Sequence, residues 1–168
     1  SGFRDIIHIS GVWGLGENIV QGTVIPDEFF VFKPMLVQKK KAIIQKKLGE
    51  KANTMIYGTD DEQPVINIPT SNEKREQFVL TDDEVTTLAN WALQIEMHYQ
   101  KPMDIEWAKD GISNRLFIIQ ARPETVHSQR NPLLVKEYQL ISKGNMLSRG
   151  DAIGSKIATG VARILQSP

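Results

Sequence analysis

The chain has 168 residues, enough for one domain of ordinary size with a substantial buried core. Apolar residues make up 40% of it and charged residues 24%, which is typical of a globular protein and argues against a disordered one. Its 20 basic residues balance its 20 acidic residues, so no net charge favours binding to nucleic acid or to an anionic membrane.

The sequence contains no cysteine. This excludes disulfides, zinc–thiolate sites, iron–sulfur clusters and cysteine nucleophiles from the chain. We expect a cytoplasmic protein, with which the lack of cysteine is compatible, and no apolar run approaches the roughly 20 residues of a membrane span. Both ends run directly into strand-like segments, so we expect the chain to be a fragment of a longer protein.

The first part of the chain predicts a strand at residues 6–9, a glycine turn at residues 11–16 and a short helix from Glu17. A strand followed by a glycine turn and a helix start can hold phosphates on backbone amides. The segment lacks the Lys–Ser/Thr pair of a P-loop and its glycines do not have the GxGxxG spacing, so a purely structural turn is the alternative.

A second strand is expected between Thr23 and Pro34, with Phe29, Val31 and Lys33 on one face. The basic run at residues 39–41 is typical of a solvated surface. Residues 42–68 predict two or three further strands, with turns at residues 49–51 and 58–61.

A capping box predicts a long helix in the middle of the chain. Thr81 can act as N-cap while Glu84 reaches back to its amide. Apolar residues then recur at helical spacing from Val85 to Tyr99, which predicts a helix over residues 82–99 that cannot continue past Pro102.

A hairpin follows the helix, with strands at residues 103–108 and 116–121 and an Asp-Gly turn signal between them. Side chains two apart on a strand share a face, so Asp104 lies beside Glu106, and Gln120 beside Arg122. Pairing Glu106 with Ile118 or with Gln120 leaves all four on one face, and only an odd offset would separate them. The opposite, apolar face is expected to carry Ile105, Trp107, Phe117, Ile119 and Ala121.

This polar face has the composition of a metal–triphosphate site. Carboxylate and amide oxygens suit Mg²⁺, which usually takes one or two protein carboxylates and completes its shell with water and substrate phosphates. The Arg122 guanidinium matches a pair of phosphate oxygens. The alternative is a cross-strand ion pair between Asp104 and Arg122 on a solvated sheet, with Glu106 and Gln120 merely hydrated.

Two long blocks of sequence resemble the phosphoenolpyruvate synthase (pyruvate, water dikinase) family. The first contains Trp13-Gly14-Leu15-Gly16-Glu17 and Pro26-Asp27-Glu28-Phe29. The second contains Asp104-Ile105-Glu106-Trp107 and Gln120-Ala121-Arg122-Pro123-Glu124-Thr125-Val126. The ending of the second block favours the synthase over rifampicin phosphotransferases, which share its core elements.

The resemblance implies an α+β fold in three parts. Residues 1–126 would be the later part of an ATP-grasp nucleotide-binding domain with antiparallel strands and a long helix. Residues 127–143 would be a linker, and residues 144–168 the start of a β-rich, mobile phosphohistidine domain. In this family, ATP phosphorylates a histidine of the mobile domain, and the overall reaction turns ATP, pyruvate and water into AMP, phosphoenolpyruvate and phosphate.

By position, Glu106 and Gln120 match the family's metal-associated residues at the ATP phosphates. Asp104 and Arg122 match neighbouring nucleotide-site residues, and Glu17 belongs to a family motif that also contains Gly14 and Gly16. The resemblance therefore implies Mg²⁺ and ATP as cofactors, with pyruvate and the missing parts of the enzyme as further partners.

The departures from the family limit what this chain can do. It lacks the Thr-Cys-His motif of the phosphohistidine, the barrel that binds pyruvate, and the early half of the ATP-grasp domain with its phosphate-binding lysine and arginine. We therefore expect no catalytic residue within the chain, no complete reaction and weak ATP binding at most. The alternatives are an antibiotic phosphotransferase of the same architecture and a non-catalytic nucleotide-binding or interaction module.

Overall fold

The computed structural model describes residues 3–60, 63–124, 142, 144–146 and 161. The chain separates into two units, residues 1–131 and 132–168, and every helix and strand named below belongs to the first. The predicted linker and the predicted strands of a second domain therefore lie almost entirely outside the described residues.

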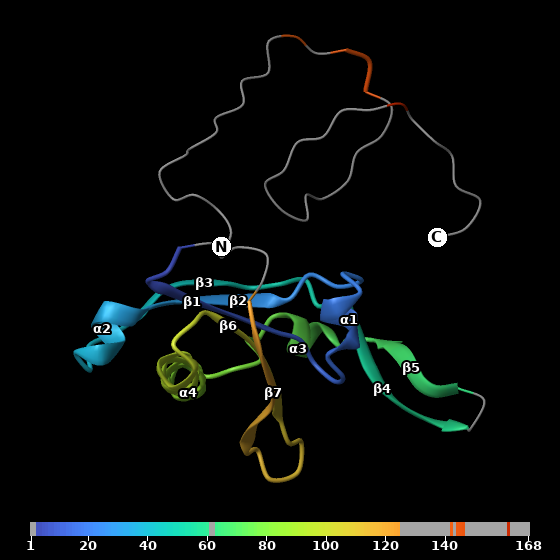
Figure 1. Cartoon of the computed structure of the whole chain (residues 1–168). Helices are drawn as coiled ribbons and strands as arrows, with labels where there is room; N and C mark the ends of the chain where they lie inside the picture. The colour runs from blue at the N-terminus through green and yellow to red at the C-terminus, as the bar shows by residue number, and fades with distance from the viewer. Residues whose placement is uncertain (1–2, 61–62, 125–141, 143, 147–160, 162–168) are drawn as a thin grey trace. The chain divides into compact units, whose positions relative to one another are not determined.

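The first unit is a mixed α+β fold, as the sequence predicts (Figure 1). Its strands form three antiparallel sheets, in the orders β1-β2-β3, β4-β5 and β6-β7. In chain order the elements are β1 (Ile6–Gly11), α1 (Glu17–Val20), β2 (Asp27–Phe32), α2 (Lys33–Val37), β3 (Ile43–Lys47), β4 (Asn53–Asp60), β5 (Gln63–Pro69), α3 (Asn72–Arg75), α4 (Asp82–Tyr99), β6 (Met103–Lys109) and β7 (Leu116–Pro123).

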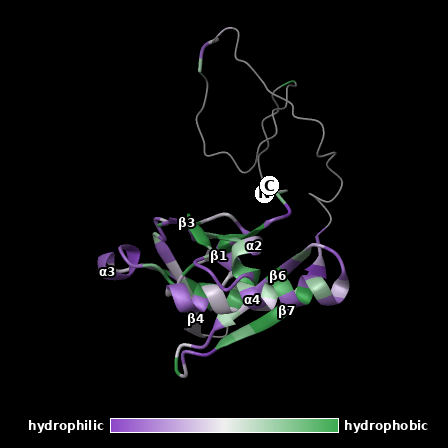
Figure 2. Cartoon of the chain, turned by 90° about the vertical axis from the view of Figure 1, so that its left-hand side faces the viewer, coloured by the Kyte–Doolittle hydropathy of each residue, from purple (hydrophilic) through white to green (hydrophobic). Residues whose placement is uncertain are grey.

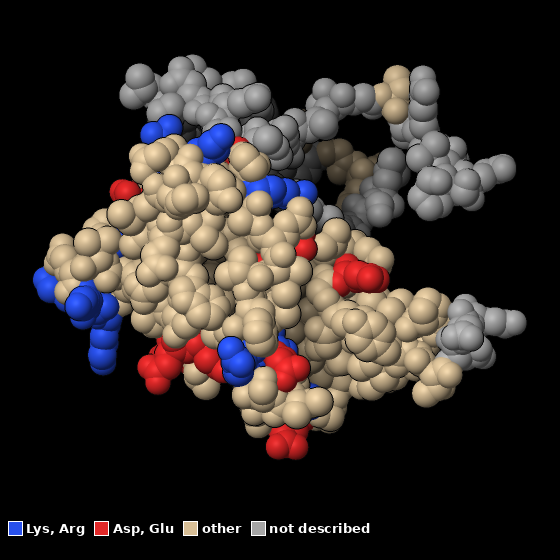
Figure 3. Space-filling view, turned by 60° about the horizontal axis from the view of Figure 1, so that its bottom comes forward, with Lys and Arg blue, Asp and Glu red and all other residues tan. Residues whose placement is uncertain are grey.

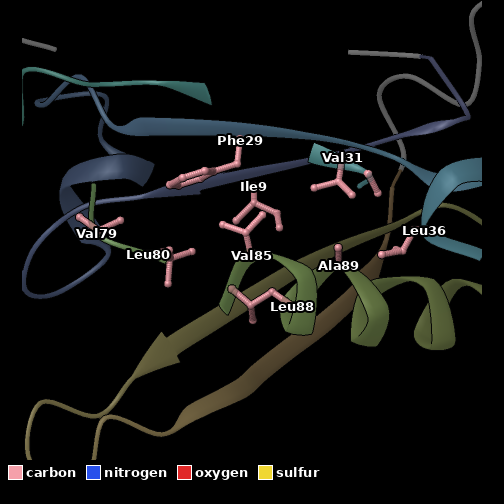
Figure 4. Close-up of a cluster of buried hydrophobic side chains, with 10 residues drawn as sticks. Ile9, Phe29, Val31, Leu36, Val79, Leu80, Val85, Leu88 and Ala89 are labelled. Carbon is pink, nitrogen blue, oxygen red and sulfur yellow. The ribbon is translucent and has the colours of Figure 1, made fainter. Parts of the chain in front are cut away.

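The core lies between the β1-β2-β3 sheet and α4. Strand β2 buries alternate residues, so Phe29 and Val31 point from one face of the sheet toward α4. Figure 4 shows these side chains, with Ile9 of β1, directed at Val85 and its neighbours on the helix. Side chains of β6 and β7 pack against the same cluster, so α4 connects the first sheet to the hairpin.

The long helix begins and ends where the sequence predicts. The Thr81 hydroxyl accepts from the Glu84 backbone amide at 3.3 Å, and Glu84 accepts from the Thr81 amide at 2.9 Å. Val85 is fully buried, whereas Tyr99 at the end of the helix is half-exposed. Gln100 ends the helix with a left-handed backbone, two residues before Pro102.

Two boundaries differ from the prediction. Strand β2 ends at Phe32 and the short helix α2 follows, because Pro34 in its first turn has no amide that would need a partner there. Lys33 therefore does not continue the buried face of β2, and its ammonium binds Glu96 of α4 at 2.6 Å. Strand β4 continues to Asp60, so residues 58–60 are not the turn that the sequence predicted.

A fully buried ion pair holds several segments together. The Asp27 carboxylate accepts from the Lys51 ammonium at 2.5 Å and from the amides of Gly49 and Val79 at 2.8 Å. The ammonium also donates to the carbonyls of Gly49 and Arg75. Each charged group is thus fully hydrogen-bonded inside the protein, which offsets the cost of removing it from water.

Gly49 permits the close approach that this arrangement requires. A Cβ atom at this position would lie 2.2 Å from the carbonyl oxygen of Pro26, a distance that real side chains do not adopt. The turn at residues 49–51 therefore lies directly against the start of β2, and Lys51 reaches Asp27 from a left-handed backbone conformation.

The described surface carries charges of both signs. In Figure 3, acidic and basic side chains form small separate groups on a larger uncharged face. The basic run at residues 39–41 is exposed, as predicted. Among the described residues, no helix is long and apolar enough to cross a membrane.

We predict that Lys51→Met destabilises the fold by about 3–5 kcal/mol, because it leaves the Asp27 charge buried without its counter-ion. Urea denaturation would measure the change in the free energy of unfolding. Lys41→Met is the control, since Lys41 is exposed and its loss should change stability by less than about 0.5 kcal/mol. Equal effects of the two substitutions would contradict a stabilising role of the buried pair.

A second prediction concerns the ion pair between Glu84 of α4 and Lys109 of β6, whose charged atoms lie 2.6 Å apart. Burial raises the pKa of Glu84, but the bonds from Lys109 and Thr81 outweigh it, so the net pKa lies below its usual value of 4.5. A lowered pKa contributes stability above pH 4.5 that is lost as the pH falls through the folded-state pKa. Urea denaturation should therefore show Glu84→Gln less stable than the unaltered chain at pH 7, with a difference that shrinks below about pH 4.5. A difference that is constant with pH would contradict this account.

Candidate functional site

The β6-β7 hairpin brings the four predicted site residues onto one exposed face. Glu106 lies directly opposite Gln120, and Asp104 directly opposite Arg122. All four residues are exposed, while Ile105 and Ala121 between them face the other way. The prediction that the four share a face is confirmed, in the second of the two even registers considered.

The register of the hairpin shifts by one residue between Glu106 and Trp107, where Ile119 of β7 has no partner. This β-bulge overturns part of the predicted apolar face. Phe117 and Ile119 are exposed, whereas Leu116 and Ile118 pack against the core. The reason is that the extra residue, Ile119, reverses which side chains of β7 face the core on the turn side of the bulge. Figure 2 shows β7 coloured as hydrophobic, consistent with four successive apolar residues of which only two can face inward.

Close packing holds the hairpin against the first sheet. The indole of Trp107 lies beside Gly11 of β1, where an added Cβ would come within 3.2 Å of the ring and 2.6 Å of Val79. Together with the ion pair between Lys109 and Glu84, this contact fixes β6 while its polar face stays exposed.

The ion pair on this face, between Arg122 and Asp104, is weak in geometry. The Arg122 Nε lies 3.8 Å from the Asp104 carboxylate, beyond hydrogen-bond distance, and the side chains are 64% and 52% exposed. An exposed pair of this kind contributes about 0–1 kcal/mol. Reorienting the guanidinium toward a phosphate would therefore cost little.

The donor set fits a metal that is shared with phosphates. Among the residues that the structure describes, no three His, Asp or Glu side chains gather into a group that could hold a metal ion. Glu106 and Gln120 nevertheless present a carboxylate and an amide directly across the strand pair. Mg²⁺ is typically bound by one or two carboxylates, with waters and substrate phosphates as its other ligands, so this pair fits Mg²⁺ together with a phosphate-bearing ligand.

Glu17 belongs to another part of the fold. It is exposed at the start of α1, which packs against β4. The glycine segment before it is attached to β4 as well, since the Leu15 amide donates to the Met55 carbonyl at 2.8 Å. Gly14 has a φ of +78° and lies so close to Met55 that no Cβ would fit, which supports the structural reading of this turn. A role of Glu17 at the nucleotide stays a prediction.

The structure also reveals a cluster that sequence spacing did not indicate, since cross-strand pairing assembles it. His8 Nε2 lies 3.1 Å from Glu28 and 3.5 Å from Ser10, and its ring stacks on Phe30. Burial lowers the pKa of His8, although Glu28 opposes this. A nucleophile–base–acid relay uses both ring nitrogens, whereas Ser10 and Glu28 here contact the same one, so the cluster lacks the geometry of a catalytic triad.

Comparison with known proteins places this hairpin in a nucleotide-binding family. Residues 1–140 match the model of the pyruvate phosphate dikinase AMP/ATP-binding domain. The chain is 50% identical over 177 residues to a phosphoenolpyruvate synthase of Aquifex aeolicus and 44% identical over 169 residues to that of Escherichia coli. Each alignment covers 98% of the chain.

The same alignments cover 20% and 21% of the two relatives, so the chain spans about a fifth of the length of the curated relatives it matches. The matched family model extends over all the helices and strands described above. The chain is thus homologous to part of the phosphoenolpyruvate synthases and belongs to the family of the pyruvate phosphate dikinase AMP/ATP-binding domain.

Proposed function

We propose that this chain is the part of a pyruvate, water dikinase that holds Mg²⁺-ATP on the exposed face of the β6-β7 hairpin. The observation that carries the proposal is the direct pairing of Glu106 with Gln120 and of Asp104 with Arg122, on one exposed face of an AMP/ATP-binding domain. A solvated sheet face would need no such gathering of metal-ligand oxygens and a guanidinium.

The four side chains share three tasks in this proposal. The side-chain oxygens of Glu106 and Gln120 would hold the metal, which supplies charge neutralisation at the phosphates when bound. Arg122 would bind phosphate oxygens through its planar fork. Asp104, opposite Arg122, would keep the guanidinium near the site through a contact that the nucleotide can easily replace. The chain's contribution is thus positioning and electrostatic stabilisation, on which phosphoryl transfer mainly depends.

The parent enzyme would convert ATP, pyruvate and water into AMP, phosphoenolpyruvate and phosphate through a phosphohistidine carried by another segment. The proposal rests on the homology to phosphoenolpyruvate synthases along 98% of this chain. In the parent, residues 1–126 would form the later part of the nucleotide-binding domain. Residues 127–143 would link it to the mobile domain, and residues 144–168 would begin that domain.

We further propose that the chain alone is inactive and binds ATP weakly. Its hairpin supplies one guanidinium and one metal-ligand pair, all of them exposed to water, where charge interactions are screened. A complementary surface from the rest of the parent would exclude water and strengthen these interactions. We expect no pyruvate-dependent release of AMP from the isolated chain.

The test is a titration of the isotope-labelled chain with Mg²⁺-ATP, followed by amide-resolved NMR. We predict chemical-shift changes centred on residues 104–106 and 120–122 at millimolar ATP. Glu106→Ala should raise the Kd for Mg²⁺-ATP by about tenfold or more, because a charge-assisted contact is lost. Glu73→Ala is the matched control, since it removes an exposed carboxylate of α3 and should leave the response unchanged.

Shifts that persist in Glu106→Ala, or that centre on another segment, would contradict the proposed site. Equal losses in Glu106→Ala and Glu73→Ala would show a general effect of charge rather than binding by the hairpin.

A further inference from the structure

The β-bulge beside the proposed site is held between two fixed ends of the hairpin. At the turn, the Asp110 amide donates to the Arg115 carbonyl at 2.9 Å, and the Asp110 carboxylate accepts from Ser113. At the other end, the Glu124 amide donates to the Pro102 carbonyl at 2.9 Å. The two ends follow registers that differ by one residue, and Ile119 is the residue that accommodates the difference.

If Ile119 were paired regularly instead of forming a bulge, the pairing set by the turn could not produce the polar face. Continued regularly from Trp107 and Ile118, that pairing would place Gln120 opposite Ile105, on the inner side of the hairpin. A slip of one residue moves every side chain to the other face, so Arg122 would turn inward as well. The bulge restores the pairing of Gln120 with Glu106.

The bulge also lies next to Glu106 and Gln120, the two proposed metal ligands. The register changes directly between Glu106 and Trp107, and both Ile119 and Gln120 are exposed although they are consecutive in β7. A bulge bends its strand, increases the local twist and changes the direction of neighbouring side chains. The direction of the Gln120 side chain is therefore set by the backbone at Ile119.

We propose that Ile119 is a positioning residue of the nucleotide site, which acts through its backbone by aiming Gln120 at the metal held by Glu106. This inference rests on the proposed function of the hairpin. It assigns the contribution to the extra residue itself, not to the isoleucine side chain, which is 64% exposed.

Deletion of Ile119 separates this role from a role in folding. The deletion leaves every other pair of the hairpin in place and on its present face, including Trp107 with Ile118 and Glu106 with Gln120, but in a regular ladder. We predict an unchanged urea midpoint and an about tenfold or greater rise in the Kd for Mg²⁺-ATP, measured by NMR titration of the full chain, since a small misplacement of a ligand is costly. Ile119→Ala, which keeps the bulge, should change the Kd by less than about twofold.

Deletion of Ile44 is the matched control. Ile44 is also an exposed isoleucine at a register shift, in β3, where the pairing passes from Phe30 with Gln45 to Val31 with Ile43. Its removal should leave the Kd unchanged. If deletion of Ile119 prevents folding, Ile119→Gly replaces it, because glycine keeps the chain length but loosens the backbone at the bulge and should weaken binding more than Ile119→Ala.

The outcomes distinguish this inference from the proposed function. No response of the unaltered chain would overturn both. A response of the unaltered chain that is equally strong after deletion of Ile119 would overturn only the positioning role. An equal loss in Ile119→Ala would also overturn it, since the side chain rather than the bulge would then contact the ligand.

Discussion

The buried pair of Asp27 and Lys51 is the interaction on which the other parts of the fold depend. It joins the start of β2, the turn at residues 49–51, the end of α3 and the segment that leads into α4. A buried charge pair is not inherently stabilising, because its desolvation costs as much as the attraction returns. Here backbone donors and acceptors complete both hydrogen-bonding shells, so the pair specifies one arrangement of four segments.

The segments joined by this ion pair also position the β6-β7 hairpin. Val79, whose amide binds Asp27, lies against Gly11, and the Trp107 indole lies against the same glycine. The inner face of the hairpin is thus fixed by the core, whereas its outer face carries the four polar side chains free of tight contacts with each other. A rigid strand pair is a suitable support for a binding site, and the long contact between Arg122 and Asp104 leaves a ligand little to displace.

Much of this could be predicted from local sequence. The capping box and the spacing of apolar residues predicted the bounds of α4, and an extended strand predicted that Phe29 and Val31 share a face. The polar face was predictable as well, since both even registers place Glu106 and Gln120 on the same side. These features depend on residues close to each other in the chain.

The features that escaped prediction depend on long-range packing. Four apolar residues in succession, Leu116 to Ile119, do not reveal which two face the core, so the bulge could not be inferred. Lys51 lies in a turn, where a lysine is normally exposed, and only its contact with Asp27 explains its burial. The short helix α2 was hidden because Phe32 and Lys33 continue the pattern of the strand.

In the proposed site, the metal–triphosphate lies over Glu106 and Gln120. Replacing Mg²⁺ by paramagnetic Mn²⁺ in the presence of ATP tests it most directly, because broadening of amide signals reports distance from the ion itself. We predict the strongest broadening at the amides of Glu106 and Gln120, and less at residues farther along β6 and β7. Broadening centred on residues 14–17 or on the lysines at residues 39–41 would contradict it.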